Sequence, residues 1–177
     1  MSWEAGVSTG RLAVLEAIAA EGQATAEIWR YLLDIDWAAT ITASLLPIDH
    51  PLFFLLARPR RMRTRVGDGI WVRLVDVGAA LAARSYSTPG PLVLEIADSF
   101  CPWNEGRWKL EDGEARRTRA AVDLRCDVGA LGSAYLGGFS FAQLLRSGRV
   151  EEARKGAGAR ADAMFRTDRH PWCPEIF

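Results

Sequence analysis

The sequence has few of the residues that build metal centres and disulfide frameworks. Its 177 residues include three cysteines and two histidines. Cys101, Cys126 and Cys173 are odd in number and show no Cys-x-x-Cys spacing, so neither a disulfide framework nor a zinc site is expected. Cys101 and Cys126 are interpreted as small buried hydrophobes, and His50 and His170, each beside a proline, as loop residues. We therefore expect no metal centre.

Net charge and long apolar runs are also missing. Twenty-two basic residues balance twenty-two acidic ones, which removes the electrostatic case for binding nucleic acid or an anionic membrane. No apolar run approaches the roughly 20 residues that a membrane helix needs, and the start lacks the pattern of a signal peptide. We expect a cytoplasmic protein with no nucleic-acid and no membrane partner. The Gly-x-Ser-x-Gly, Walker A and His-Glu-x-x-His motifs are absent as well.

The first third of the chain predicts a strand, a helix and a strand. Residues Arg11 to Ala19 fit either a strand or a helix, because periodicity alone does not separate the two. Thr25 to Ile35 predicts a helix with Ile28, Tyr31, Leu32 and Ile35 on one apolar stripe, which Trp29 and Leu33 widen. Ala39 to Ala43 is typical of a strand, and Leu52 to Ala57 of a short apolar turn or helix.

A basic run follows, with five arginines between Arg58 and Arg65. Such a run either contacts a phosphate or acidic partner or forms a solvated connector, and we favour the connector. We place the boundary between two domains here, with residues 1–62 in one and 63–177 in the other.

The rest of the chain is organised around Asp68 to Tyr86. Ile70, Val72 and Leu74 alternate with Trp71 and its neighbours, which predicts a strand that runs directly into an Ala-rich helix. The further predicted elements are strands at 92–96, 107–110 and 121–125, a turn at 111–113, a helix at 128–136 capped by Asp127, a helix at 141–146 capped by Ser140, and an interrupted helix at 150–165. This order predicts an α+β domain with helices packed on one face of a mostly antiparallel sheet.

Four runs resemble one family. Asp68–Val77, Phe100–Trp108, Leu131–Gly138 and Trp29–Asp36 are similar to segments of the Eis-like (enhanced intracellular survival) N-acetyltransferases of the general acetyltransferase (GNAT) class. The resemblance implies a sterol-carrier-like domain at 63–177, preceded by a partial acetyltransferase-like β-α-β segment, and it favours a strand at Arg11 to Ala19. We expect no counterpart in these residues of the amino-terminal domain that holds acetyl-CoA in that family.

The resemblance therefore implies acetyl-CoA for the intact enzyme and no cofactor in this chain. The nearest approach to a pyrophosphate-binding loop is Ala153–Gly158, where backbone amides at a helix start would hold the phosphates. This run begins with alanine, where the family loop has arginine or glutamine, and we expect no strand before it. We interpret it as a chance match.

The resemblance also implies a role for the chain end. In the family, the last carboxylate enters the active site and serves as general base, which here falls to Phe177. Glu175 and Ile176 are then expected to contact substrate. An α-carboxylate is ionised at neutral pH and accepts a proton within hydrogen-bond reach. The alternative is a frayed terminus.

The aromatic residues leave a further alternative. Trp71, Trp103, Trp108 and Tyr135 either line a pocket for a hydrophobic small molecule or belong to the core and sheet faces, and we favour the core. The leading hypothesis is the carboxy-terminal portion of an Eis-like enzyme, inactive alone, which contributes an acceptor-pocket wall and oligomer contacts. Its partners would be the missing amino-terminal domain and further copies of the chain. The alternatives are a free-standing carrier of a hydrophobic molecule and a structural module.

Overall fold

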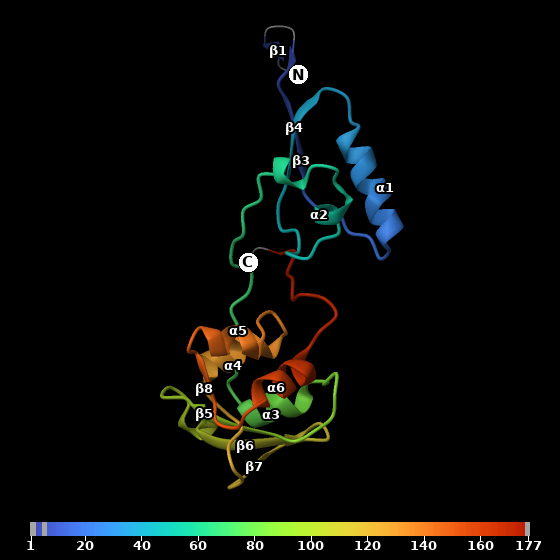
Figure 1. Cartoon of the computed structure of the whole chain (residues 1–177). Coiled ribbons are helices and arrows are strands. Elements are labelled where there is room, and N and C mark those ends of the chain that lie inside the picture. The colour runs from blue at the N-terminus through green and yellow to red at the C-terminus, as the bar shows by residue number, and fades with distance from the viewer. Residues whose placement is uncertain (1–2, 5–6, 176–177) are drawn as a thin grey trace. The chain divides into compact units, whose positions relative to one another are not determined.

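A computed structural model describes residues 3–4 and 7–175. The chain divides into two compact units, Met1–Ile70 with Trp172–Phe177, and Trp71–Pro171 (Figure 1). The predicted domain boundary after residue 62 stays a prediction. Each unit is described by itself below.

The first unit is built on a β-α-β segment. Strand β3 (Gly10–Val14) pairs in parallel with β4 (Ala38–Ala43), and helix α1 (Gly22–Leu33) connects them. The predicted β-α-β segment is thus confirmed, and so is the strand near Arg11 that the resemblance favoured. The buried face of α1 carries Thr25 and Trp29, and Ile28 and Leu32 are half-buried. The predicted apolar stripe is therefore right at Trp29 and wrong at Tyr31 and Leu33, which are 71% and 48% exposed.

Short elements complete this unit. They are the antiparallel strands β1 (Trp3–Glu4) and β2 (Val7–Ser8), helix α2 (Leu52–Leu55) and the 3-10 turn η1 (Pro59–Arg61). Leu52 is buried, while the arginines around η1 are exposed. The exposure of these arginines agrees with a solvated connector.

The second unit is a five-stranded mixed sheet in the order β7-β6-β5-β8-β9. Its strands are β5 (Leu92–Ala97), β6 (Gly106–Glu111), β7 (Glu114–Arg117), β8 (Leu124–Asp127) and β9 (Val150–Glu152). The β5–β8 pair is parallel and the others are antiparallel. Asp112 and Gly113 close the β6–β7 hairpin with φ angles of 52° and 78°, as a type I′ turn requires.

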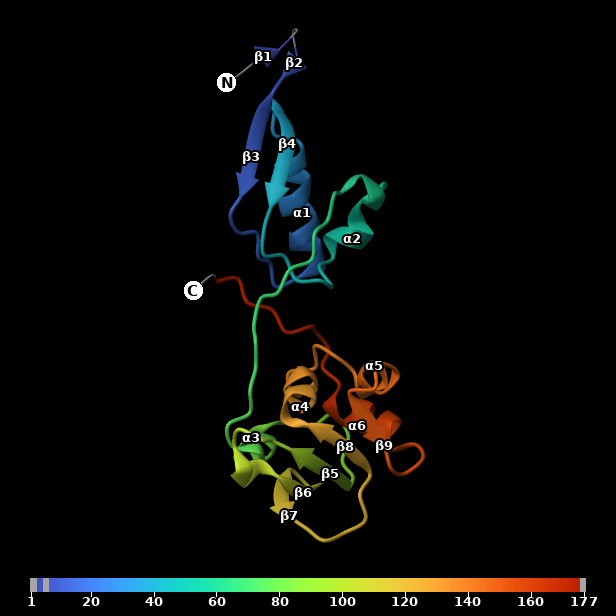
Figure 2. The same ribbon diagram turned by 90° about the vertical axis from the view of Figure 1, so that its left-hand side faces the viewer.

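Four helices lie on one side of this sheet: α3 (Val77–Ala83), α4 (Val128–Tyr135), α5 (Phe141–Arg146) and α6 (Ala157–Phe165) (Figures 1 and 2). The predicted α+β class is confirmed. Asp127 caps α4 by accepting a hydrogen bond from the Ala130 amide, and Ser140 forms a capping box with Gln143 on α5. Both caps were predicted from the sequence.

The core lies between sheet and helices. β5 contributes Leu92, Leu94 and Ile96 to it, and Phe141 and Leu131 come from the helices, each no more than 2% exposed. On the opposite face of the sheet a row of alternating charges crosses four strands, β6, β5, β8 and β9. Glu95 accepts hydrogen bonds of 2.8 Å from both Arg107 and Arg125, and Arg125 also donates to Glu151 at 2.6 Å. We call this the charged row.

The strand predicted from Ile70 to Val77 is wrong. Leu74 is buried and Val72 half-buried, while Ile70, Trp71, Arg73 and Val75 are exposed, so the burial alternates only from Trp71 to Val75. The segment nevertheless pairs with no strand of the described residues. Side chains replace the backbone hydrogen bonds of a strand pair here. The carbonyl of Val75 accepts hydrogen bonds from the side chains of Trp103 and Asn104.

Two further boundaries differ from the sequence prediction. The strand predicted at 121–125 begins later, at Leu124, and the predicted interrupted helix at 150–165 is strand β9 followed by helix α6. Strand β7 was not predicted at all. The two missed strands, β7 and β9, lie at the edges of the sheet. Both carry charged residues, which mask the apolar–polar alternation by which strands are recognised.

Candidate functional site

The carboxy-terminal tail is the first candidate. No helix or strand is found between Arg166 and Glu175. Within the first unit, the Trp172 indole donates a hydrogen bond to the carbonyl of Leu45, just after β4. Leu45 has a φ of 57°, a left-handed conformation that is uncommon for leucine. The tail therefore lies against the loop that follows β4.

The three predicted site residues lie at the end of this tail. Glu175 is exposed, and its carbonyl lies 3.6 Å from the Cys173 sulfur. Ile176 and Phe177 lie outside the described residues. The proposed general base and its neighbours therefore remain predictions.

His50 lies in a loop, as predicted, but it is buried there. Its Nδ1 accepts a hydrogen bond of 3.0 Å from the Leu52 amide at the start of α2, and its ring stands edge-on to Trp29 at 5.8 Å. Burial lowers the pKa of His50, against the opposing charge of Asp49. A neutral imidazole that accepts from a backbone amide is a structural cap rather than a catalyst.

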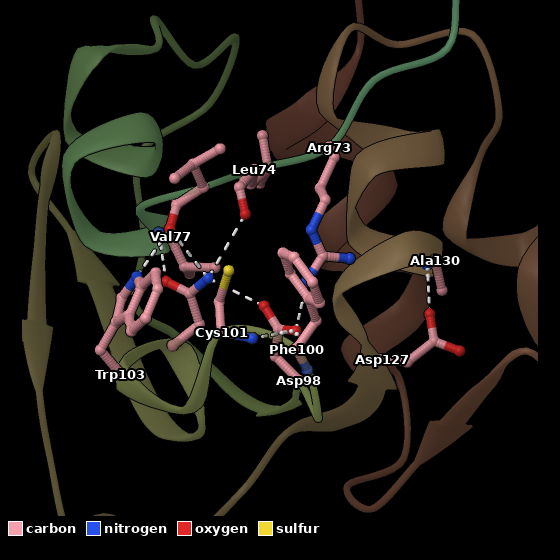
Figure 3. A network of polar contacts seen from close by, with 11 residues as sticks. Arg73, Leu74, Val77, Asp98, Phe100, Cys101, Trp103, Asp127 and Ala130 are labelled. Carbon is pink, nitrogen blue, oxygen red and sulfur yellow. Dashed lines mark hydrogen bonds and ion pairs between the residues drawn. The ribbon is translucent and has the colours of Figure 1, made fainter.

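A polar network ties residues 73–77 to the segment between β5 and β6 (Figure 3). Asn104 is fully buried and sits at its centre. Its Oδ1 accepts from the Val77 amide at 2.9 Å, and its Nδ2 donates to the Leu74 carbonyl at 3.3 Å and to Asp98 at 2.9 Å. Since Val77 is the first residue of α3, this side chain satisfies an amide that the helix itself leaves unpaired.

Asp98 is the anionic member of the network. It accepts hydrogen bonds from the amides of Phe100 and Cys101 and forms an ion pair with Arg73, whose guanidinium also lies 5.2 Å from the centre of the Phe100 ring (Figure 3). Burial alone raises the pKa of Asp98, but the hydrogen bonds from Asn104, Cys101 and Arg73 outweigh it, so the pKa is lowered. With its partners all supplied internally, this network stabilises structure and leaves no group poised for catalysis.

The four aromatic residues divide into two pairs. Trp108 and Tyr135 pack against the core, and the Tyr135 hydroxyl donates to the Ala80 carbonyl at 2.8 Å. Trp71 and Trp103 are 85% and 60% exposed. The prediction of core aromatics is thus wrong for Trp71 and Trp103, because their segments pack through Val72, Leu74 and Asn104 instead.

The Ala153–Gly158 run has a structural context that the sequence did not reveal. Strand β9 precedes it and α6 begins at Ala157, so the expectation of no preceding strand was wrong. The Gly158 amide, however, donates to the Glu152 carboxylate at 2.8 Å, and a Cβ on Gly158 would lie 2.4 Å from Leu145. An anion is already supplied by the protein and the glycine permits close helix packing, so the loop does not fit a pyrophosphate.

A hollow of about 400 Å³ lies elsewhere in the second unit. Its wall is mostly apolar, with three basic side chains and one acidic one. The residues are Thr88, Pro89, Gly90, Pro91, Val93, Lys109, Ala120, Ala121, Asp123, Arg154, Arg160, Ala163 and Met164. We call it the Asp123 hollow. None of the four aromatic residues singled out from the sequence lines it, and no pattern in the sequence indicated it.

The remaining candidate groups are inert. Cys101 and Cys126 are buried, as predicted, and burial raises the pKa of the Cys126 thiol to about 12. Among residues 3–4 and 7–175, no cluster of histidine, cysteine and acidic side chains has the arrangement of a metal site. In the same residues no helix is long and apolar enough to cross a membrane.

Two family models match the chain. An acetyltransferase (GNAT) domain matches residues 1–74 and a sterol carrier protein domain matches residues 77–174. An uncharacterised N-acetyltransferase of Streptomyces avermitilis is 44% identical over 99% of this chain and 44% of its own length. N-acetyltransferase Eis of Mycobacterium tuberculosis is 34% identical over 89% of this chain and 39% of its own length. The chain thus spans less than half of the length of these relatives.

The chain also resembles solved structures. Eis1 from Mycobacterium abscessus superposes with a TM-score of 0.85 at 38% identity, covering 94% of this chain and 43% of that one. A GCN5-related N-acetyltransferase from Anabaena variabilis gives a TM-score of 0.69 at 22% identity, over 94% of this chain and 44% of its own, which shows likeness of fold alone.

Proposed function

We propose that the chain, which belongs to the sterol carrier protein domain family through residues 77–174 and also matches an acetyltransferase (GNAT) domain at residues 1–74, forms the carboxy-terminal portion of an Eis-like N-acetyltransferase. In this proposal it supplies a wall of the acceptor-amine pocket and the terminal carboxylate, and it is inactive alone. Acceptors would be amines such as aminoglycosides or lysine side chains.

The open face of the first unit carries this proposal. β3 and β4 form a parallel pair of two strands in which most residues of β4 are exposed. Parallel strands are normally covered on both faces. Leu15, Phe54 and Tyr31 of this unit are 85%, 86% and 71% exposed. These apolar surfaces suit contact with a further acetyltransferase segment, which would extend the sheet and cover them.

The tail supports the role proposed for Phe177. The hydrogen bond between Trp172 and Leu45 directs the tail toward the end of β4, the same unit that the further segment would complete. The Phe177 carboxylate would then take a proton from the acceptor amine, and Glu175 and Ile176 would contact that acceptor.

The relatives are N-acetyltransferases, which implies acetyl-CoA as the acetyl donor. We propose that the further segment, and not this chain, holds it. The β9–α6 loop supports this proposal, because its Gly158 amide already donates to the Glu152 carboxylate. A pyrophosphate would meet that negative charge instead of a free hydrogen-bond donor. We also propose that the assembled enzyme is a cytoplasmic homo-oligomer without nucleic-acid or membrane partners.

Thiol release from acetyl-CoA with an aminoglycoside or a lysine-bearing peptide tests the proposal. The chain alone should show no turnover, and co-expression with the residues of the Streptomyces avermitilis relative that lie outside the matched region should restore it. Removing Phe177 from the restored complex moves the terminal carboxylate back by one residue, to Ile176. This displacement should lower the turnover number about a hundredfold, the scale of general base catalysis. Turnover by the chain alone would contradict the proposal. A complex that assembles but never turns over would favour the structural module.

A further inference from the structure

The Asp123 hollow lies where the start of β5, the segment between β7 and β8, and helix α6 meet in the second unit. Its volume of about 400 Å³ is within the range of ligand sites in proteins, roughly 300 to 1,000 Å³. Most of its wall is apolar, with Val93, Ala121, Ala163 and Met164 among the lining residues. Such a wall favours a ligand with an apolar body.

The charged side chains of the hollow are not balanced. Asp123 is buried, and its Oδ2 accepts from the Val93 amide at 2.8 Å. Its Oδ1 accepts from Arg160 at 2.9 Å and lies 3.4 Å from Arg154. One carboxylate thus faces two guanidinium groups. Lys109 leaves the balance unchanged, because it is paired with Glu111 at 2.6 Å.

The two arginines retain donors for a further anion. A guanidinium has five N–H donors, and each arginine uses one nitrogen on Asp123: Nη2 of Arg160 and Nε of Arg154. Their side chains are 44% and 56% exposed, so the remaining donors are accessible from solvent. Asp123 holds both arginine side chains in place. Binding of an anion would therefore cost less side-chain entropy, because these side chains are already ordered.

We propose that the Asp123 hollow binds a small organic carboxylate, with its head group on Arg154 and Arg160 and its apolar body against Met164 and Ala163. The site lies wholly within the second unit and does not depend on the acetyltransferase proposal. Its test measures binding, so failure of one proposal does not affect the other.

Methyl NMR on the full chain with labelled methionine provides the direct test. The probes are octanoate, which carries both features, octanol, which lacks the charge, and acetate, which lacks the apolar body. Octanoate should shift the Met164 methyl resonance in a saturable manner and leave that of Met62, in the first unit, unchanged. Octanol should bind at least about tenfold more weakly because it lacks the carboxylate that pairs with the arginines. Acetate should do the same because it lacks the apolar chain that packs against the wall.

Three variants localise the site. Arg154→Gln should weaken octanoate binding about tenfold through loss of a charge-assisted hydrogen bond, and Arg160 remains to pair with the buried Asp123. Ala121→Phe, on an exposed part of the wall, should block the hollow without changing its charge. Arg149→Gln is the matched control, because Arg149 is 51% exposed and lies 3.4 Å from Asp127, close to the values for Arg154.

The outcomes separate cleanly. Loss of octanoate binding in Arg154→Gln and Ala121→Phe, with retention in Arg149→Gln, supports the proposal. It is overturned if octanoate leaves Met164 unmoved, if octanol binds as tightly as octanoate, or if Arg149→Gln loses as much affinity as Arg154→Gln. Circular dichroism of each variant shows that it is folded, and the two independent variants guard against a failure of either one to fold.

Discussion

Replacement of Asn104 by alanine should destabilise the second unit more than its size suggests. The change removes the acceptor of the buried Val77 amide and a donor to the Leu74 carbonyl. An unpaired buried backbone group costs roughly 1 to 3 kcal/mol, so the two together predict a loss of about 3 kcal/mol in the free energy of unfolding. Urea unfolding followed by circular dichroism measures it.

Trp103→Phe is the matched control for Asn104→Ala. The Trp103 indole donates to the Val75 carbonyl at 2.8 Å, but that carbonyl also accepts from Asn104 at 3.1 Å. The control should therefore lose less than about 1 kcal/mol, the net value of one satisfied hydrogen bond. If Asn104→Ala costs no more than Trp103→Phe, the network does not anchor residues 73–77 and the reasoning is wrong.

Three further changes have defined outcomes. His50→Gln should remove a pH dependence of the free energy of unfolding. The pKa of His50 is lowered from 6.5 in the folded chain, so the unfolded chain takes up the proton at a higher pH. The wild-type chain should therefore lose stability as the pH falls from 6.5 toward the lowered pKa. Unfolding at a series of pH values measures this. Gly132→Ala should cost about 1 to 3 kcal/mol, since its Cβ would lie 2.6 Å from the Val72 carbonyl, whereas Gly67→Ala meets nothing within 4 Å; thermal unfolding compares them. Asp127→Ala should cost about 1 kcal/mol by removing the α4 cap, and denaturant unfolding should show no such loss if the cap is dispensable.

Features that depend on near neighbours in the chain could be predicted from the sequence. Asp127 caps the helix that begins at the next residue, and Asp112 and Gly113 form the predicted turn after β6. The apolar residues of β5 likewise predict a buried strand on their own. In each case the residues that specify the cap, turn or strand are adjacent in the sequence to the element itself. Its prediction therefore requires no knowledge of contacts with distant residues.

Features that depend on distant residues could not be predicted. The segment 70–76 has the alternation of a strand, but a strand needs a neighbour, and here the contacts come from Trp103 and Asn104, about thirty residues away. The Asp123 hollow likewise combines residues from 88 to 164, and no local pattern links them. The predicted role of Phe177 rests on resemblance and stays a prediction.

The charged row on the open face of the sheet has a consequence for the behaviour of the protein in concentrated salt. Glu95, Arg107, Arg125 and Glu151 form three ion pairs between neighbouring strands. The attractions act at direct contact and exceed the repulsions between the more distant like charges, so dissolved ions reduce a net attraction there. Rising ionic strength should therefore slightly reduce the contribution of these ion pairs to stability. Ions that are excluded from the protein surface should instead increase the contribution of the apolar core on the other face of the sheet. Sodium chloride and sodium sulfate should consequently shift the melting temperature in opposite directions.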